Sequence, residues 1–127
     1  MKRLPFLILL LCVACNRAET PRQAGAPAAP AAPAGNTERG RQLAAQYGCN
    51  VCHAIPGVDG PQGSLGPSLA GMASRPTISM GVVQNTPGKV ALFIQDPATL
   101  NPQSSMPAMG IAPNDAQDIA AFLATLQ

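Results

Sequence analysis

Apolar residues recur at helical spacing in three stretches between positions 36 and 127. In the first stretch they occupy positions i, i+3, i+4 and i+7 of one face, which contains Gly40, Leu43, Ala44 and Tyr47. Asn36 or Thr37 can cap this helix at its start, and Gly48 ends it. The pattern therefore predicts an amphipathic helix that buries this face.

Two further helices are predicted towards the C-terminus. Thr86 followed by Pro87 is a typical helix start, and Pro97 stops the segment. The apolar face of this second helix contains Val90, Phe93 and Ile94. The last helix runs from Asn114 or Asp115 to Leu126, and its buried face contains Ile119, Phe122, Leu123 and Leu126.

The segments between these helices are rich in Gly and Pro. Residues 54–66 and 101–112 are predicted to be loops, with a short helical turn over Ser68 to Met72. No alternating pattern of useful length predicts a strand. The fold class is therefore all-α, a small helical domain with long loops, and such loops need something large to organise them.

The N-terminal part of the chain has a different composition. Met1-Lys2-Arg3, an apolar run up to Leu11 and small residues near Ala14 are typical of a targeting signal over residues 1–15. The run is too short for a membrane span, which needs about 20 apolar residues. Residues 16–35 are dominated by Ala, Pro and Gly, so we expect a flexible linker that acts as a stalk, or a tail without a mechanical role.

Cys15 stands where a bacterial lipoprotein signal places its lipidated cysteine, after the small residues Val13-Ala14 and before the polar residue Asn16. This position predicts lipidation at Cys15 and a periplasmic or otherwise extracytoplasmic protein tethered to the membrane. Ordinary cleavage nearby, which would remove Cys15, is the alternative. The folded domain would then be residues 36–127.

Charge adds little to this picture. The chain has eight Lys and Arg against six Asp and Glu, and removal of Lys2 and Arg3 leaves six against six. A neutral protein is not steered towards nucleic acid or an anionic surface, so docking to partners should be apolar and local. Aromatic residues make up only 3% of the chain. A small domain with so few large side chains gains from a bound apolar group in its core.

Cys49-Asn50-Val51-Cys52-His53 is the C-x-x-C-H signature of covalent haem attachment. Two thiols about one helical turn apart can each add to one vinyl group of the porphyrin, and the adjacent His53 can then bind the iron. A zinc site needs four ligands, yet His53 is the only histidine. A thioredoxin-like pair would need a βαβ context that is not predicted, whereas a simple disulfide remains open.

A sixth iron ligand must come from another part of the chain. Because there is no second histidine, a methionine thioether is the natural candidate. Beyond Met1 the candidates are Met72, Met80, Met106 and Met109. Met106 lies in a Pro-bounded loop before the last helix, whereas Met72 and Met109 are interpreted as core filler.

Together these motifs resemble class I cytochrome c over residues 36–127. Gly40 and Tyr47 are similar to the glycine and aromatic residue of the family's first helix, which crosses the aromatic of the last helix, here Phe122. The resemblance implies a cytochrome c fold around one covalent haem c. Gly66-Pro67-Ser68-Leu69 resembles a motif whose proline carbonyl, here that of Pro67, orients the ligand histidine. Met106-Pro107 resembles the family's ligand methionine and the proline after it.

The segments Ala73-Ser74-Arg75, Asn85-Thr86-Pro87 and Ile94-Gln95-Asp96-Pro97 resemble, more narrowly, the cytochrome c domain fused to subunit II of some haem–copper oxidases. That likeness implies that Arg75 and Asn85 hydrogen-bond a haem propionate. For Arg75 the alternative is a solvated loop charge. The family often has a tryptophan near the propionates, and this chain has none.

The resemblance implies a single-electron carrier rather than an enzyme, because His53 and Met106 would fill both axial positions of the iron. We expect it to exchange electrons with redox proteins and to pass them to a high-potential acceptor such as a terminal oxidase. A tethered electron-entry subunit of a larger redox complex is one alternative. A haem enzyme or gas sensor, with an open sixth position, is another.

Overall fold

The computed structural model describes residues 35–127, so the predicted targeting segment, the lipidation at Cys15 and the linker up to residue 34 lie outside the described residues. In the described range no helix has the length and apolar character needed to cross a bilayer.

The elements of this range are α1 (Thr37–Gln46), α2 (Cys49–Cys52), the 3-10 turn η1 (Met72–Ser74), β1 (Thr77–Ile78), β2 (Val83–Gln84), α3 (Pro87–Gln95), α4 (Pro97–Leu100) and α5 (Pro113–Leu123).

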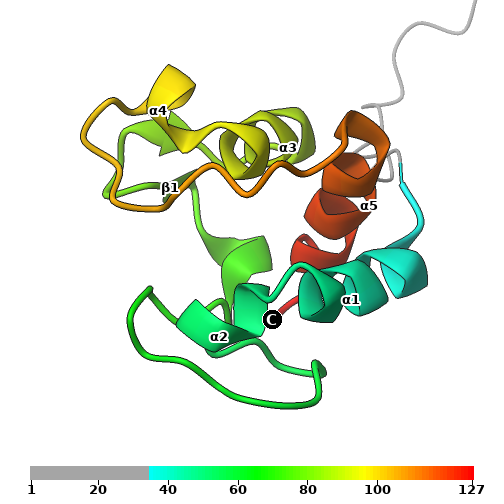
Figure 1. The fold of residues 1–127 in the computed structure, drawn as a ribbon. Helices are drawn as coiled ribbons and strands as arrows, with labels where there is room; N and C mark the ends of the chain where they lie inside the picture. Colours follow the sequence, from blue (N-terminus) through cyan, green and yellow to red (C-terminus); the bar gives the residue numbers. More distant parts are fainter. Residues whose placement is uncertain (1–34) are drawn as a thin grey trace, which may run out of the picture.

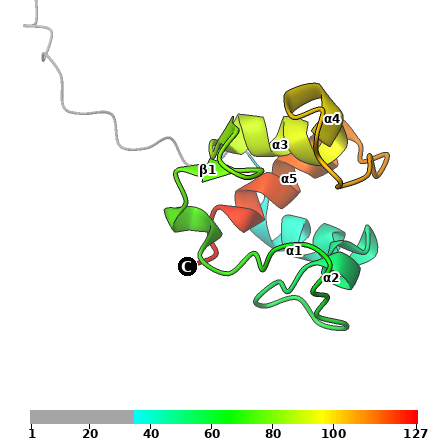
Figure 2. The same ribbon diagram turned by 90° about the vertical axis from the view of Figure 1, so that its left-hand side faces the viewer.

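Helix α5 lies between the other two long helices. Figures 1 and 2 show α1 and α2 on one side of α5, and α3 and α4 on the other. All the core residues predicted for the last two helices are buried, which confirms both apolar faces: Val90, Phe93, Ile94, Ile119, Phe122, Leu123 and Leu126. α5 ends at Leu123, however, so Leu126 is buried beyond the end of the helix that was predicted to reach it. The predicted all-α fold class is confirmed by this helical architecture, in which the two strands span only two residues each.

The predicted first helix is also confirmed. The Asn36 side chain caps α1 by accepting a hydrogen bond from the backbone N–H of Arg39 at 2.9 Å. Gly40, Leu43 and Ala44 are buried on the predicted face. Tyr47, which the sequence placed on the same face, is the half-buried C-cap residue.

The backbones of α1 and α5 come closest at Gly40. A Cβ atom at this position would lie 1.9 Å from the carbonyl oxygen of Asp118 and 2.5 Å from its carbonyl carbon. No side chain fits between two backbones at such a distance. The crossing therefore requires glycine for the space that it leaves free, not for its conformational freedom.

A cluster of polar groups closes the edge of this crossing. Arg39 forms ion pairs with Asp115 and Asp118 of α5. The Tyr47 hydroxyl donates to Asp115 Oδ2 at 2.8 Å, and the Asn36 N–H donates to Asp118 Oδ1 at 2.7 Å. The pKa of Asp115 is lowered by the Tyr47 hydrogen bond and by Arg39, and that of Asp118 by the Asn36 N–H and by Arg39.

The structure differs from the sequence prediction in its short elements. α2 forms over the C-x-x-C segment, where no separate helix was predicted, and Pro97 starts α4 although it was expected only to stop α3. The turn predicted over Ser68 to Met72 is instead η1, which begins at Met72. β1 and β2 pair antiparallel through Ile78 and Val83, where no strand was predicted. Each element spans only two to four residues, which is too short for a periodic pattern.

Replacement of Gly40 by alanine should push α1 away from α5. We expect Gly40→Ala to lower the free energy of unfolding by about 3 kcal/mol or more, at the upper end of over-packing costs, because backbone must move. Gly88→Ala in α3 is the matched control, since a Cβ there meets no atom within 4 Å. This control should change stability by no more than about 1 kcal/mol. Thermal unfolding followed by circular dichroism measures both, and equal effects would contradict the role of the crossing.

The Arg39 cluster should stabilise the fold in a pH-dependent way. The folded-state pKa values of Asp115 and Asp118 lie below those of a free aspartate, about 3.9 in an unfolded chain. The contribution of the cluster is therefore present above about pH 4 and is lost as the pH falls through the lower folded-state values. Arg39→Gln should lower the melting temperature most near neutral pH and least in acid.

Arg41→Gln is the control for this experiment, because the ion pair of Arg41 is with Glu38 of its own helix and its one other bond in the described residues is a long one, 3.3 Å, to the Gly57 carbonyl. Its effect on the melting temperature should be smaller than that of Arg39→Gln at neutral pH. A loss of stability in Arg39→Gln that is equally large at low pH would show that the ion pairs do not carry the effect.

Candidate cofactor-binding site

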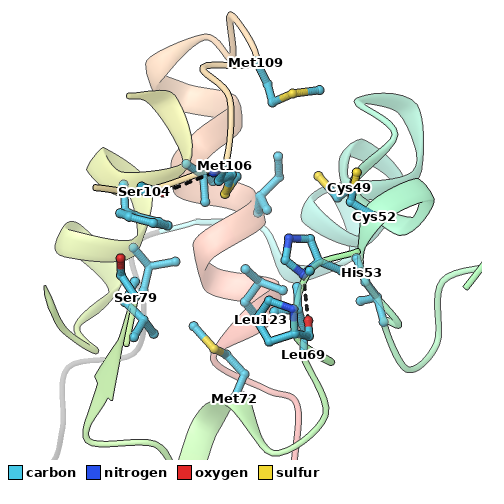
Figure 3. A pocket seen from close by; sticks show the side chains of 18 of the residues that line it. Cys49, Cys52, His53, Leu69, Met72, Ser79, Ser104, Met106, Met109 and Leu123 are labelled. Atoms are coloured by element: carbon cyan, nitrogen blue, oxygen red, sulfur yellow. Dashed lines mark hydrogen bonds between the residues drawn. The ribbon is translucent and has the colours of Figure 1, made fainter. Parts of the chain in front are cut away.

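A cavity of about 390 Å³ opens between the α1–α2 side and the α3 side of the domain. This volume is within the range of roughly 300–1,000 Å³ that is usual for small-molecule and cofactor sites. Most side chains in its wall are apolar, and they come from α3, α5 and the loops as well as from the C-x-x-C-H segment. Figure 3 shows the cavity with its sulfur-bearing and imidazole side chains. A large apolar group with one metal-binding centre suits such a wall.

Both cysteines of the motif reach this cavity from one helical turn. Gly48, at φ 72°, reverses the chain after α1, so that α2 begins at Cys49 and ends at Cys52. The two thiols form no disulfide with each other. Burial raises the pKa of the Cys49 thiol. A reactive dithiol pair needs a lowered thiol pKa, so this environment disfavours the thioredoxin-like alternative.

His53 follows α2 directly and lines the same cavity. Its Nδ1 lies 2.7 Å from the carbonyl oxygen of Pro67. Because a carbonyl only accepts, Nδ1 carries the proton and donates it to this bond. Nε2 is then left with its lone pair available to a metal ion, and Figure 3 shows the ring turned towards the interior of the cavity. The predicted partner of the histidine, Pro67, thus lies where the resemblance implied.

The loop that carries Pro67 is packed tightly on the imidazole. A Cβ atom on Gly66 would lie 2.3 Å from His53 Cε1 and 2.6 Å from Nδ1. The Gly66 N–H donates to the carbonyl of Cys52 at 2.8 Å. Only a glycine allows the loop to lie against the ring and still reach the backbone of α2. The contact with Gly66 restricts rotation of the His53 ring, whereas the bond to Pro67 sets its tautomer.

Met106 lies across the cavity from His53, with its sulfur towards the imidazole side (Figure 3). It is half-buried, and its N–H donates to the Ser104 hydroxyl at 3.3 Å. Pro107 follows it and also lines the cavity. The sequence-predicted ligand pair therefore occupies opposite walls of one cavity.

All the other methionines of the described residues line the cavity too. Met72 is buried, whereas Met109 is 40% and Met80 82% exposed. Met72 fits its interpretation as core filler, but Met109 lies at the cavity mouth. Met80 was among the candidate sixth ligands, but no packing role was assigned to it, because it lies in the turn of a hairpin that was not predicted.

Arg75 and Asn85 are placed differently from one another. Arg75 lines the cavity, and its Nη2 donates to the carbonyls of Ser68 and Ala70, both at 2.7 Å. Asn85 is not in the cavity wall, and its Nδ2 donates to the carbonyls of Met72 at 2.7 Å and Arg75 at 2.8 Å. Both side chains brace the segment around η1. Their contact with a haem propionate stays a prediction.

The residues present fit a covalently held haem. The cavity places two free thiols, an oriented imidazole and a thioether around an apolar interior. Within residues 35–127, no three His, Cys, Asp or Glu side chains come together as a purely protein-made metal centre would require. The iron of a porphyrin, which needs only two axial protein ligands, suits this donor set.

Comparison with known proteins identifies the family. No curated protein matches the chain. The family model described as cytochrome c matches residues 37–127, which is well over half of the chain and includes every helix of the described range and every side chain that lines the cavity; the match confirms the predicted cytochrome c fold. The chain therefore belongs to the cytochrome c family, whose members hold a covalent haem c with its iron and transfer electrons.

Proposed function

We propose that this protein is a single-electron carrier whose haem c is attached through Cys49 and Cys52 and is ligated by His53 and Met106. The observation that carries the proposal is the opposition of the His53 imidazole and the Met106 thioether across the cavity, beside the two free thiols. When bound, the haem supplies a one-electron iron couple, and methionine opposite histidine raises its reduction potential.

The protein groups around the cavity have distinct tasks in this proposal. The Pro67 carbonyl holds the Nδ1 proton of His53, which makes the other ring nitrogen a better donor. The Gly66 backbone limits the rotation of the ring. The apolar wall excludes water, which favours a fixed set of ligands over exchange with solvent. With His53 and Met106 both holding the iron, no coordination site would be left for a substrate.

For the partners, we propose a mid-chain electron donor and a high-potential acceptor such as a terminal oxidase. The His/Met pair supports this choice, because it sets a relatively high potential. A permanent electron-entry subunit of a redox complex would have the same chemistry and would differ by copurifying with that complex. A haem enzyme or gas sensor would differ in its optical spectrum, since an open sixth position gives a high-spin or ligand-sensitive species.

We further propose that the protein is exported and tethered by a lipid on Cys15, with residues 16–35 as the linker. The N-terminal sequence pattern supports this location. Cys15→Ser should release the protein from the membrane fraction or block its maturation, as measured by fractionation and by the mass of the mature N-terminus. A mature chain that begins beyond Cys15 without an acyl group would contradict lipidation and leave export intact.

The ligand assignment predicts different results for the two methionines of one loop. Met106→Ala should abolish the weak iron–sulfur charge-transfer band at the red end of the oxidised spectrum, lower the reduction potential and let small ligands reach the iron. Met109→Ala should keep the band. Because Met109 is 40% exposed, its truncation should cost less than the about 2–5 kcal/mol typical of a fully buried methionine.

Acid–acetone extraction is the control for both variants, since thioether bonds should keep the haem with the polypeptide. Should the haem pass into the solvent, covalent attachment is wrong for this chain. Should Met109→Ala erase the band while Met106→Ala keeps it, the sixth ligand is Met109.

A further inference from the structure

Asn101, the residue directly after α4, is one of only two buried polar residues in the described range. It does not line the cavity. Its Oδ1 accepts from the Gln103 N–H at 3.1 Å, and its Nδ2 donates to the Ser79 hydroxyl at 2.9 Å. Because a backbone N–H only donates, the first bond fixes which way the amide points. A buried amide is tolerated only with such partners, so the two bonds are what this side chain contributes.

The bonds of Asn101 build the turn that leads to Met106. The Asn101 N–H donates to the Pro97 carbonyl, and the Ser104 N–H donates to the Asn101 carbonyl, both at 2.9 Å. The Ser104 hydroxyl then accepts from the Met106 N–H at 3.3 Å, the dashed bond beside Met106 in Figure 3. The backbone that carries the thioether is therefore connected to Asn101 through Ser104.

The other end of this hydrogen-bond chain is the turn between β1 and β2. Ser79 and Met80 have positive φ, at 52° and 57°, which costs energy for any residue with a side chain. A turn of this kind persists when its surroundings hold it. The bond from Asn101 reaches Ser79 from 22 residues away in the sequence. Figure 3 shows Ser79, Ser104 and Met106 across the cavity from His53.

The hairpin is a firm support for the Met106 loop, because its base is held to the segment around η1. The Asn85 N–H donates to the Pro76 carbonyl at 3.0 Å, and the Asn85 side chain donates to the carbonyls of Met72 and Arg75. Met72 is itself buried in the core. Residues 101–112, by contrast, contain neither helix nor strand that could fix Met106. Among the described residues, Asn101 is thus the side chain that connects this loop to the hairpin.

We propose that Asn101 is a positioning residue for the sixth iron ligand, because it fastens the loop of Met106 to the β1–β2 hairpin and so keeps the thioether on the iron. The inference rests on the ligation by Met106 in the proposed function and adds the residue that controls how often this ligand is released. A released thioether rebinds only when its loop returns it to the same place, so a braced loop favours the closed sixth site.

Competition with added imidazole measures this control in the whole oxidised holoprotein. Imidazole reaches the iron only when Met106 has left it, so its apparent affinity reports the fraction of open molecules. Asn101→Ala, which removes both side-chain bonds, should tighten imidazole binding roughly tenfold. The iron–sulfur charge-transfer band should still be present before imidazole is added, since Met106 is unchanged.

Ser79→Ala removes only the bond to the hairpin and should tighten imidazole binding by a smaller factor. In this proposal Ser79 acts only through Asn101, so the double variant should bind imidazole as Asn101→Ala does. Amide hydrogen exchange gives a readout that does not involve the iron. The N–H groups of Gln103, Ser104 and Met106 should lose more protection in Asn101→Ala than those of α5.

Gln62→Ala is the matched control, because Gln62 makes the same two kinds of bond in a loop that does not contain Met106. Its Oε1 accepts from the Ile55 N–H at 2.7 Å, and its Nε2 donates to the Val58 carbonyl at 2.8 Å. The control should lower the melting temperature, as Asn101→Ala does, and leave the imidazole affinity unchanged. A difference between the two variants separates a positioning role from a general loss of stability.

An imidazole affinity in Asn101→Ala equal to that of the wild type would overturn the proposal. So would an equally large gain in Gln62→Ala, since release of Met106 would then follow overall stability. Additive effects of Ser79→Ala and Asn101→Ala would overturn the role of the hairpin as the support. A wild type without the charge-transfer band would instead refute the ligation by Met106, and with it the proposed function itself.

Discussion

The contact between the backbones of α1 and α5 at Gly40 is the constraint on which the rest of the domain depends. α2 follows α1 after a single left-handed residue, Gly48, so the position of α1 also sets the position of Cys49 and Cys52. The opposite side of α5 supports α3, and α5 itself supplies Ile119 and Leu123 to the cavity wall. The crossing thus sets the distance between the wall that holds the cysteines and the wall that faces them.

The cavity explains how so small a domain is stabilised with few aromatic residues. The buried side chains of the described range are mostly aliphatic and small. Several of the larger ones, such as Phe93, line the cavity. A covalent haem c adds apolar area where the chain has none of its own, and its attachment prevents loss of that area by dissociation. The core of the folded protein is therefore shared between the polypeptide and its cofactor.

Much of this architecture could be predicted from the sequence, because the apolar residues of a long amphipathic helix recur along the chain at helical spacing. The faces of α1, α3 and α5 and the Asn36 cap follow from the spacing of apolar residues and from capping chemistry. The C-x-x-C-H motif is equally local, because two residues between the cysteines place both thiols about one helical turn apart. The position of Pro67 beside His53 came from family resemblance, because nothing in the spacing of residues 53 and 67 shows a hydrogen bond.

What the sequence did not show depends on contacts between distant residues. The Arg39 cluster joins positions that lie 76 and 79 residues apart, and no pattern along the chain indicates such pairing. The β1–β2 hairpin has strands of two residues, so alternation cannot be recognised. Its left-handed turn contains Ser79 and Met80, which do not signal positive φ as Asn-Gly would. The place of Met80 in the cavity wall became visible only with the hairpin in place.

The segment from Ala54 to Leu69 has consequences for the motions of the domain. It contains neither helix nor strand, yet the N–H groups of Gly63, Gly66 and Leu69 donate to the carbonyls of Asn50, Cys52 and Ala54. The Gln62 side chain links the two ends of the loop over residues 55–62: its Oε1 accepts from the Ile55 N–H, and its Nε2 donates to the Val58 carbonyl. These amides should exchange with deuterated solvent on the slow timescale of a core helix. This irregular segment would then open only together with the core of the domain, and fast local fluctuations would not reach His53.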